Sequence, residues 1–364
     1  MLICDPGPVP GNASRYFDDP VAAAAQPRGR LGIAVSDAGH VHNALFAPEL
    51  IRYDAGYLTT SCEVSGAGWL PTLEYLPYVL RHWTGSPPSV CDVGCGQGEF
   101  VAALRGRGVE AVGFDPVLRA PGEHLYRDYW TPQDSRGDAD LLVMRCVLPH
   151  IPDPWAWLQR AASRPRHVLI EFQRLEWLVE KSVWYGLNHD HVNYFRLQDF
   201  TTRYRVVDSG RFADGEWAWV LIQIGGDDIA QEQASSDGDM GHSPLPGVSS
   251  LNQSRADATE HLRAVERPIV LWGAAGKGVV AADALLRSDI LVLAAVDLDA
   301  NKWDKFLEAS AVGVISPDRL LGGGGTRTRW LRSRIPATST LFERSSARFV
   351  PKESSHSRRA ISKE

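Results

Sequence analysis

Apolar and polar positions alternate in short blocks through the middle of the chain. Four apolar runs have the length of buried strands, at residues 90–93, 110–114, 140–144 and 167–172. Residues 99–106 between the first two carry apolar side chains at helical spacing. Strands separated by helices in this way predict an α/β fold with a parallel sheet and helices on its faces. Residues 206–224 form two alternating runs around a Gly-Asp turn, which predicts an antiparallel hairpin.

A second, smaller α/β unit follows a polar segment. Residues 269–272 and 292–296 predict strands on either side of a helix over 278–286, and residues 259–265 predict a helix in front of them. The pattern therefore divides the chain into five parts, namely an N-terminal region (1–52), a main domain (53–225), a linker (226–256), a C-terminal domain (257–321) and a tail (322–364).

Composition narrows the class of protein. Of 364 residues, 44% are hydrophobic and 23% are charged, as in a globular protein, and the net charge of −6 argues against a nucleic-acid-binding surface. No apolar run is long enough to span a bilayer, the start lacks a signal-peptide pattern, and the five cysteines are odd in number and widely spread. These features predict a cytoplasmic protein with no membrane partner. The tail is basic and rich in serine, which predicts either a disordered extension or a sequence out of register through a frameshift.

The segment from Val90 to Phe100 carries the strongest local signal. A buried strand runs into a glycine turn and then a helix, with the spacing D-x-G-x-G-x-G. Glycine lets a backbone approach a ligand without a Cβ in the way, and a helix N-terminus offers free N–H groups. The candidate cofactor contacts in this turn are Asp92, Gly94, Cys95, Gly96 and Gly98.

Acidic residues around the turn indicate the charge of its ligand. Asp92 precedes the glycines, Glu99 opens the helix, and Asp115 ends the next strand, where nucleotide-binding α/β folds place the acid that binds ribose hydroxyls. A diphosphate favours a helix N-terminus free of negative charge. The acids therefore favour a cationic ligand, and S-adenosylmethionine has a sulfonium, an ammonium and a ribose but no phosphate.

This stretch resembles motif I of the class I S-adenosylmethionine-dependent methyltransferases, and the resemblance extends over residues 53–170. It implies a Rossmann-like methyltransferase domain, with Asp115 and Pro116 at the ribose and Asp128 near the adenine amine. Residues 145–154 resemble the family's segment after the fourth strand, which implies that Arg145 also lies at the cofactor, although Pro149 replaces the usual glutamate.

A narrower resemblance concerns residues 188–195, NHDHVNYF, which are similar to the EHxxYF signature of the deoxysugar C-methyltransferases. That family has a small N-terminal zinc module, a methyltransferase domain and a C-terminal Rossmann-like domain, and this chain has a counterpart of each. The zinc ligands are expected as Cys-x-x-Cys pairs, but Ser36 stands at such a position and only Cys4 remains. One thiolate cannot make a closed four-ligand site, so the zinc module is degenerate and no bound zinc is predicted.

Candidate catalytic residues follow from the same resemblance. C-methylation beside a ketone needs a base for the α-proton, and His191 suits that role because its ordinary pKa lies near neutrality. Asp190 replaces the family's Glu and is expected to orient or polarise the site, and His150 is expected to bind the enolate oxygen or the sugar. Tyr57 and Tyr194 are candidate hydroxyl donors to the substrate. The alternative is structural, with the histidines on a polar loop and the tyrosines packed in the core.

A second glycine turn lies at residues 273–278, but an alanine occupies its second glycine position. Lys277 suits a phosphate, and Gly273 and Asp297 stand in the turn and at the end of the next strand. The resemblance implies that this unit holds the nucleotide part of an NDP-sugar. The alternative is a structural module with no ligand.

The sequence as a whole predicts an S-adenosylmethionine-dependent methyltransferase that acts on a small molecule, at a carbon of a nucleotide-linked keto-deoxysugar. One alternative is O- or N-methylation of another small metabolite, because the cofactor half of the site defines the donor and not the acceptor. Another is a catalytically silent protein that binds the cofactor.

Overall fold

The computed structural model describes residues 2–54, 56–58, 70–163, 166–225 and 247–321. The tail over 322–364 and most of the expected linker lie outside these described residues. Within them, no helix is both long enough and apolar enough to cross a membrane.

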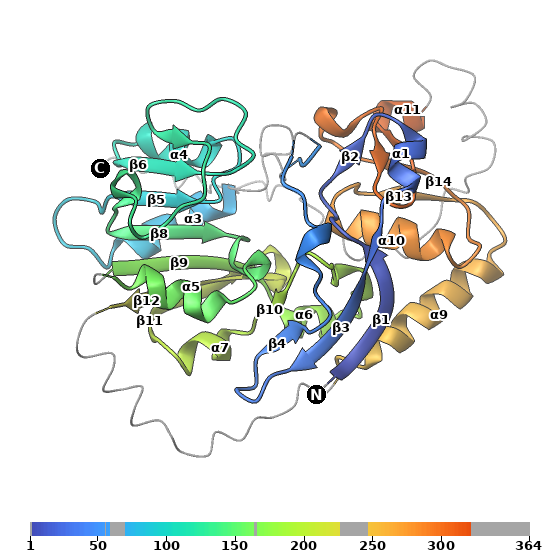
Figure 1. Ribbon diagram of the computed structural model, residues 1–364, viewed down its shortest axis with the longest axis horizontal. Helices are drawn as coiled ribbons and strands as arrows, with labels where there is room; N and C mark the ends of the chain where they lie inside the picture. Colours follow the sequence, from blue (N-terminus) through green and yellow to red (C-terminus); the bar gives the residue numbers. More distant parts are fainter. Residues whose placement is uncertain (1, 55, 59–69, 164–165, 226–246, 322–364) are drawn as a thin grey trace, which may run out of the picture.

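A seven-stranded sheet forms the centre of the main domain (Figure 1). Its strands, in spatial order, are β11 (Arg205–Phe212), β12 (Trp217–Ile224), β9 (Arg166–Gln173), β8 (Leu141–Arg145), β5 (Val90–Val93), β6 (Ala111–Phe114) and β7 (Leu125–Tyr126). Strands β9, β8, β5, β6 and β7 are parallel, and the β11–β12 hairpin joins antiparallel at β9. The expected parallel sheet and its terminal hairpin are therefore both present.

Apolar side chains cover both faces of this sheet. In β8, Leu142 and Met144 pack on one face, whereas Leu141 and Val143 pack on the other with Phe100. A strand buried on both faces reads as a continuous apolar run, as residues 140–144 do in the sequence. The helices of this domain are α3 (Leu70–Leu80), α4 (Glu99–Arg105), α5 (Pro154–Ala161), α6 (Leu175–Glu180) and α7 (Leu197–Thr201).

The N-terminal region forms a four-stranded antiparallel sheet that is completed by the main domain. Its order is β1 (Leu2–Pro10), β3 (Arg28–Val35), β4 (Val41–Asn43) and β10 (Asn193–Tyr194). Because β10 comes from the NHDHVNYF segment, the N-terminal sheet and that segment are one structural unit. The expected boundary after residue 52 therefore does not separate two independent folds.

The C-terminal unit is a three-stranded parallel sheet with helices. Its strands run in the order β13 (Ile269–Trp272), β14 (Val292–Val296) and β16 (Val314–Ile315), and its helices are α9 (Ser250–Ala264), α10 (Gly276–Leu286) and α11 (Pro317–Leu321). Helix α9 begins nine residues before the expected start at 259, so the prediction of a linker as far as 256 is wrong. Few of its residues are buried, Leu251 and Thr259 among them, and its polar sequence gave little helical periodicity.

The C-terminal unit packs on the N-terminal strands, which lie between it and the central sheet (Figure 1). Helix α10 contacts β1, and the short strand β15 (Phe306–Leu307) pairs with β2 (Tyr16–Phe17). Helix α1 (Pro20–Ala24) follows β2 and contacts β15. The C-terminal unit is therefore fastened to the N-terminal region at β1, β2 and α1.

Candidate functional site

The first glycine turn follows β5 and leads into α4. Gly94, Gly96 and Gly98 all have positive φ, at 77°, 62° and 91°, a region that other residues rarely adopt. A Cβ on Gly94 would lie 2.3 Å from a methyl carbon of Val147, and one on Gly98 would lie 2.5 Å from a methyl carbon of Leu125. Both the conformation and the close approach therefore require glycine here.

Asp115 lies beside this turn, just after β6. Its carboxylate accepts hydrogen bonds from the amide of Gly96 at 2.9 Å and from the amide of Val117 at 2.8 Å, so Pro116 stands at the centre of a tight turn. Burial, with a smaller contribution from the charge of Asp92, raises the pKa of Asp115 to about 6 against the lowering effect of the two amides. The acid expected at the ribose is thus next to the glycine turn.

Asp92 is fully buried under the turn and pairs with Arg145. Their carboxylate and guanidinium lie 3.0 Å apart, and the guanidinium stacks over Phe100 with 4.5 Å to the ring centre. The second carboxylate oxygen of Asp92, Oδ1, is buried without a hydrogen bond. Arg145 therefore stabilises the buried carboxylate of Asp92 at the base of the glycine turn.

Glu171 is a buried acid that the sequence did not single out. It lies in β9 and accepts hydrogen bonds from Thr72 and Tyr75 of α3. Burial raises its pKa, and the positive charge of Arg145 opposes that shift. The available signal was a carboxylate inside the apolar run at 167–172, where an uncompensated charge is costly.

Cys95 and Asp128, two of the expected cofactor contacts, make other contacts in the structure. The thiol of Cys95 is buried against β6, where its sulfur would lie 2.7 Å from a Cβ on Gly113, so the side chain faces the core. Asp128 has a side chain that is 57% exposed and pairs with Arg136 at 3.3 Å. The prediction that it contacts the adenine amine remains untested, and its partner in the structure is an arginine.

The expected catalytic residues His150, Asp190 and His191 lie together. The Nδ1–H of His150 donates to the main-chain carbonyl of Asp190 at 2.9 Å, and the two imidazole rings are 4.8 Å apart, edge to face. Burial, and then the charge of His150, lowers the pKa of His191 well below its ordinary value. His191 is therefore neutral near pH 7 and can accept a proton.

Asp190 is 5% exposed, and its Oδ1 is buried without a hydrogen-bond partner. Its other oxygen lies 3.9 Å from Nδ1 of His150. Burial raises the pKa of this carboxyl, while the positive form of His150 would lower it. The free oxygen is the most direct sign that this junction is prepared for a polar ligand.

Tyr57 and Tyr53 lie within range of the charges of both Asp190 and Asp115. The ring of Tyr57 contacts Tyr53 at 5.0 Å between centres, and the charges of Asp190 and Asp115 both contribute to the raised pKa of each phenol, after burial. Tyr53 was missed because one tyrosine in a polar segment carries no spacing signal. The two phenols remain protonated near pH 7.

Tyr194 does not fit the expected role. Its side chain is buried, and its hydroxyl donates to the carbonyl of Asn188 at 2.9 Å. A hydroxyl has a single proton, so this bond leaves none for a substrate. The structure supports the alternative interpretation of Tyr194 as a core aromatic.

The second glycine turn is tied to its surroundings. Gly273 has φ of 104°, and the next amide, of Ala274, donates to Asp297 at 2.9 Å. Lys302 lies 3.3 Å from the same carboxylate oxygen. Lys277, the expected phosphate ligand, pairs with Glu216 of the β11–β12 hairpin region and lies over the ring of Trp177.

Comparison with known proteins adds to this geometry. Residues 71–205 match a family model described as "Methyltransferase domain". These residues form a class I S-adenosylmethionine-dependent methyltransferase domain. The match contains the glycine turn, Asp115, His150 and His191, and it ends at Arg205, the first residue of β11. No curated protein matches the sequence.

Several solved methyltransferase structures are similar to part of this chain at low identity. The 1,6-didemethyltoxoflavin-N1-methyltransferase of Burkholderia thailandensis is 17% identical, over 44% of this chain and 79% of its own, with a TM-score of 0.34. Magnesium protoporphyrin IX methyltransferase of Synechocystis PCC 6803 is 16% identical, over 48% and 91%, with a TM-score of 0.34. A Haloferax volcanii methyltransferase in complex with the Trm112 activator is 13% identical, over 45% and 92%, with a TM-score of 0.36.

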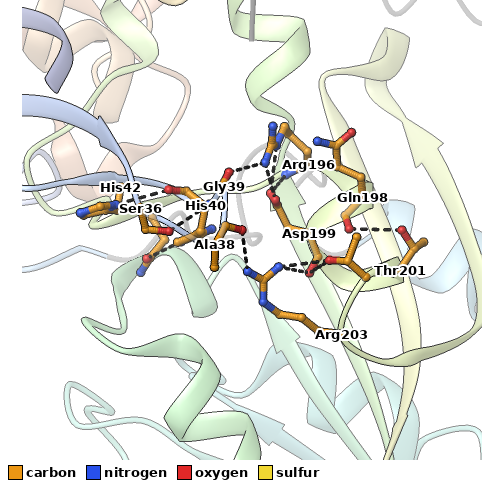
Figure 2. A network of polar contacts seen from close by, with 12 residues as sticks. Ser36, Ala38, Gly39, His40, His42, Arg196, Gln198, Asp199, Thr201 and Arg203 are labelled. Atoms are coloured by element: carbon orange, nitrogen blue, oxygen red, sulfur yellow. Dashed lines mark hydrogen bonds and ion pairs between the residues drawn. The ribbon is translucent and has the colours of Figure 1, made fainter. Parts of the chain in front are cut away.

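Arginines of the methyltransferase domain hold the loop where the zinc cysteines were expected (Figure 2). Arg196 donates to the carbonyl of Gly39 at 2.6 Å, and Arg203 donates to the carbonyl of Ala38 at 3.1 Å. Arg196 is fixed in turn by Asp199 at 2.6 Å. No group of three or more potential metal ligands occurs among the described residues. The contacts of these two arginines therefore fasten the loop directly to the domain.

Proposed function

We propose that this chain transfers a methyl group from S-adenosylmethionine to a carbon atom of a small molecule, a nucleotide-linked keto-deoxysugar. The observation that carries the proposal is the junction of His150, Asp190 and His191, in which the neutral imidazole of His191 packs against the ring of His150, and His150 lies 3.9 Å from the buried carboxylate of Asp190. Proton abstraction next to a ketone requires such a base, whereas methylation of an already nucleophilic atom does not.

The first glycine turn fits the methyl donor in its chemistry. The Asp115 carboxylate can accept hydrogen bonds from ribose hydroxyls, since carboxylate oxygens have more acceptor sites than its two amide contacts use. The unpartnered oxygen of Asp92 adds an acceptor under the same turn. When bound there, S-adenosylmethionine supplies an electrophilic methyl group.

The remaining steps are proton abstraction and stabilisation of the enolate, and different residues carry them out. His191 accepts the α-proton from the carbon next to the ketone, and the electron pair of that C–H bond moves toward the ketone oxygen. Tyr57 retains its phenolic proton, because burial and the charge of Asp190 raise its pKa, and it donates to the developing enolate oxygen. His150 is held by its bond to the Asp190 carbonyl and positions the base from the side.

The second glycine turn can hold the nucleotide part through its backbone. A Cβ on Gly273 would meet no atom within 4 Å, so the turn is open at this point, and the adjoining Trp272 is 52% exposed. An exposed indole provides a stacking surface for a base. Because Lys277 is engaged with Glu216, Gly273 and Asp297 are the stronger candidates for nucleotide contacts.

The test uses methyl-labelled S-adenosylmethionine with a dTDP-linked 4-keto-6-deoxyhexose, and the product is located by mass spectrometry. Methylation at carbon is expected, and His191→Asn is expected to lower turnover at least 100-fold while the affinity for S-adenosylhomocysteine, measured by calorimetry, stays unchanged. The exposed His261→Asn on α9 serves as the matched control and should behave as wild type. Methylation of oxygen or nitrogen on another acceptor, or cofactor binding without any turnover, would contradict the proposal.

A further inference from the structure

Glu308 is a buried acidic residue of the C-terminal unit that packs against the N-terminal region. Glu308 directly follows β15, and it is only 2% exposed. The pairing of β15 with β2 fixes the backbone before it, and the amide of Ala309 donates to the carbonyl of Ala23 at 2.9 Å. The side chain therefore starts from a backbone that is fastened on both sides to the N-terminal region.

The two oxygens of Glu308 differ in their surroundings. Oε1 accepts a hydrogen bond from the amide of Asn12 at 2.9 Å and a second from the amide of Gly11. Oε2 is buried and has no hydrogen-bond partner. Among the described residues Glu308 forms no ion pair, and the nearby Arg15 pairs with Asp54 at 2.6 Å. A buried carboxylate oxygen without a partner is unusual and calls for an explanation.

Glu308 and Asp190 lie at the same end of the β1–β3 pair. Glu308 accepts a hydrogen bond from the amide of Asn12, just after β1, and the ring of His189, next to Asp190, packs against Gly29 of β3, which pairs with Val9 of β1. The charge of Asp190 is one of the causes, after burial, that raise the pKa of Glu308 to about 7. Asp190 also carries a buried, unpartnered oxygen. Two buried carboxylates with free acceptor positions therefore lie near one another, and they come from two different parts of the chain.

We propose that Glu308 is a substrate-binding residue, and that its Oε2 and the Oδ1 of Asp190 accept hydrogen bonds from two hydroxyl or amino groups of the methyl acceptor. The inference rests on the proposed function and deepens it, because it assigns the acceptor a minimum of two hydrogen-bond donors next to the methylated carbon. It also gives the C-terminal unit a part in recognising the acceptor itself, in addition to a nucleotide attached to it.

Glu308→Gln is a sharp test because the amides of Gly11 and Asn12 dictate its orientation. Both are donors, so the amide oxygen of the glutamine must take the place of Oε1, and its NH2 group then replaces Oε2. The free position changes from acceptor to donor with little change in shape. The matched control is Asp299→Asn, since Asp299 is also buried in the same unit, accepts a hydrogen bond on Oδ1, and has an Oδ2 without a hydrogen bond that lies 3.9 Å from the ammonium of Lys302.

Binding of dTDP and of the dTDP-linked keto-deoxyhexose is measured by calorimetry for wild type and both variants, together with KM, kcat and the affinity for S-adenosylhomocysteine. The sugar should strengthen wild-type binding over dTDP alone, and Glu308→Gln should lower the affinity for the sugar nucleotide at least tenfold. Its affinities for dTDP and for S-adenosylhomocysteine should match wild type, as should all values for Asp299→Asn.

Equal sugar-nucleotide affinity and KM in Glu308→Gln and wild type would overturn the inference and leave the proposed function intact. Wild-type protein that binds the sugar nucleotide no better than dTDP would also overturn it. Loss of sugar affinity in Glu308→Gln, without methylation by wild type, would support Glu308 and reject the proposed reaction.

Discussion

The two glycine turns of this protein share one construction and differ in their charge balance. In each, a parallel strand ends in a glycine with positive φ, and an aspartate at the end of the next strand accepts a hydrogen bond from a turn amide at 2.9 Å. Asp297 of the second turn is neutralised by Lys302 at 3.3 Å. Asp115 of the first turn forms no ion pair within the described part of the chain, and its pKa is raised to about 6.

The glycines of the two turns also differ in the groups that they pack against. In the second turn, a Cβ on Gly278 would lie 2.0 Å from the carbonyl oxygen of Gly273, so glycine there serves the internal packing of turn and helix. In the first turn, the glycines pack against Val147, which follows β8, and against Leu125 of β7. A turn with a buried, uncompensated acid gains most from a ligand that supplies hydrogen-bond donors.

The largest expected effect is on cofactor affinity, and it should distinguish Asp115 from Asp297. Asp115→Ala should weaken S-adenosylhomocysteine binding by about 1.5–3 kcal/mol, or roughly 10- to 150-fold, because hydrogen bonds to a charged group are lost. Asp297→Ala, the matched substitution in the second turn, should leave that affinity unchanged. Calorimetry measures both, with thermal unfolding to show that each variant is folded. Similar losses in the two variants would remove the distinction between the turns.

The sequence predicted the first turn better than the second because its glycine and acid spacing is set by local geometry. Strand β5 and the position of Asp115 follow from that spacing, and both are found as expected. Glu308 carries no such signal, since its neighbours Gly11 and Asn12 are almost 300 positions away. Lys277 looked like a phosphate ligand in the sequence, and only the tertiary packing reveals Glu216 beside it.

A smaller effect should appear in the pH dependence of cofactor binding. Burial raises the pKa of Asp115 from 3.8 to about 6, so folding favours its protonated form, and ionisation costs stability as the pH rises through this interval. Ribose hydroxyls donate to the ionised form. The affinity for S-adenosylhomocysteine should therefore rise about tenfold from pH 5 to pH 7 and then level off. Asp115→Ala should lack this rise, and a pH dependence that persists in the variant would assign it to another group.

The smallest expected effect concerns the contact that holds the second turn to the β11–β12 hairpin region. Lys277→Ala and Glu216→Gln each remove the pair between Lys277 and Glu216, and both should lower the free energy of unfolding by about 0.5–1 kcal/mol. If the lysine is structural, neither change should alter dTDP affinity more than about twofold. A phosphate-binding lysine predicts the opposite pattern, with weaker dTDP binding in Lys277→Ala and tighter binding in Glu216→Gln, where the ammonium is released. Calorimetry with dTDP on the two variants therefore decides whether the second turn uses its lysine for a ligand or for the fold.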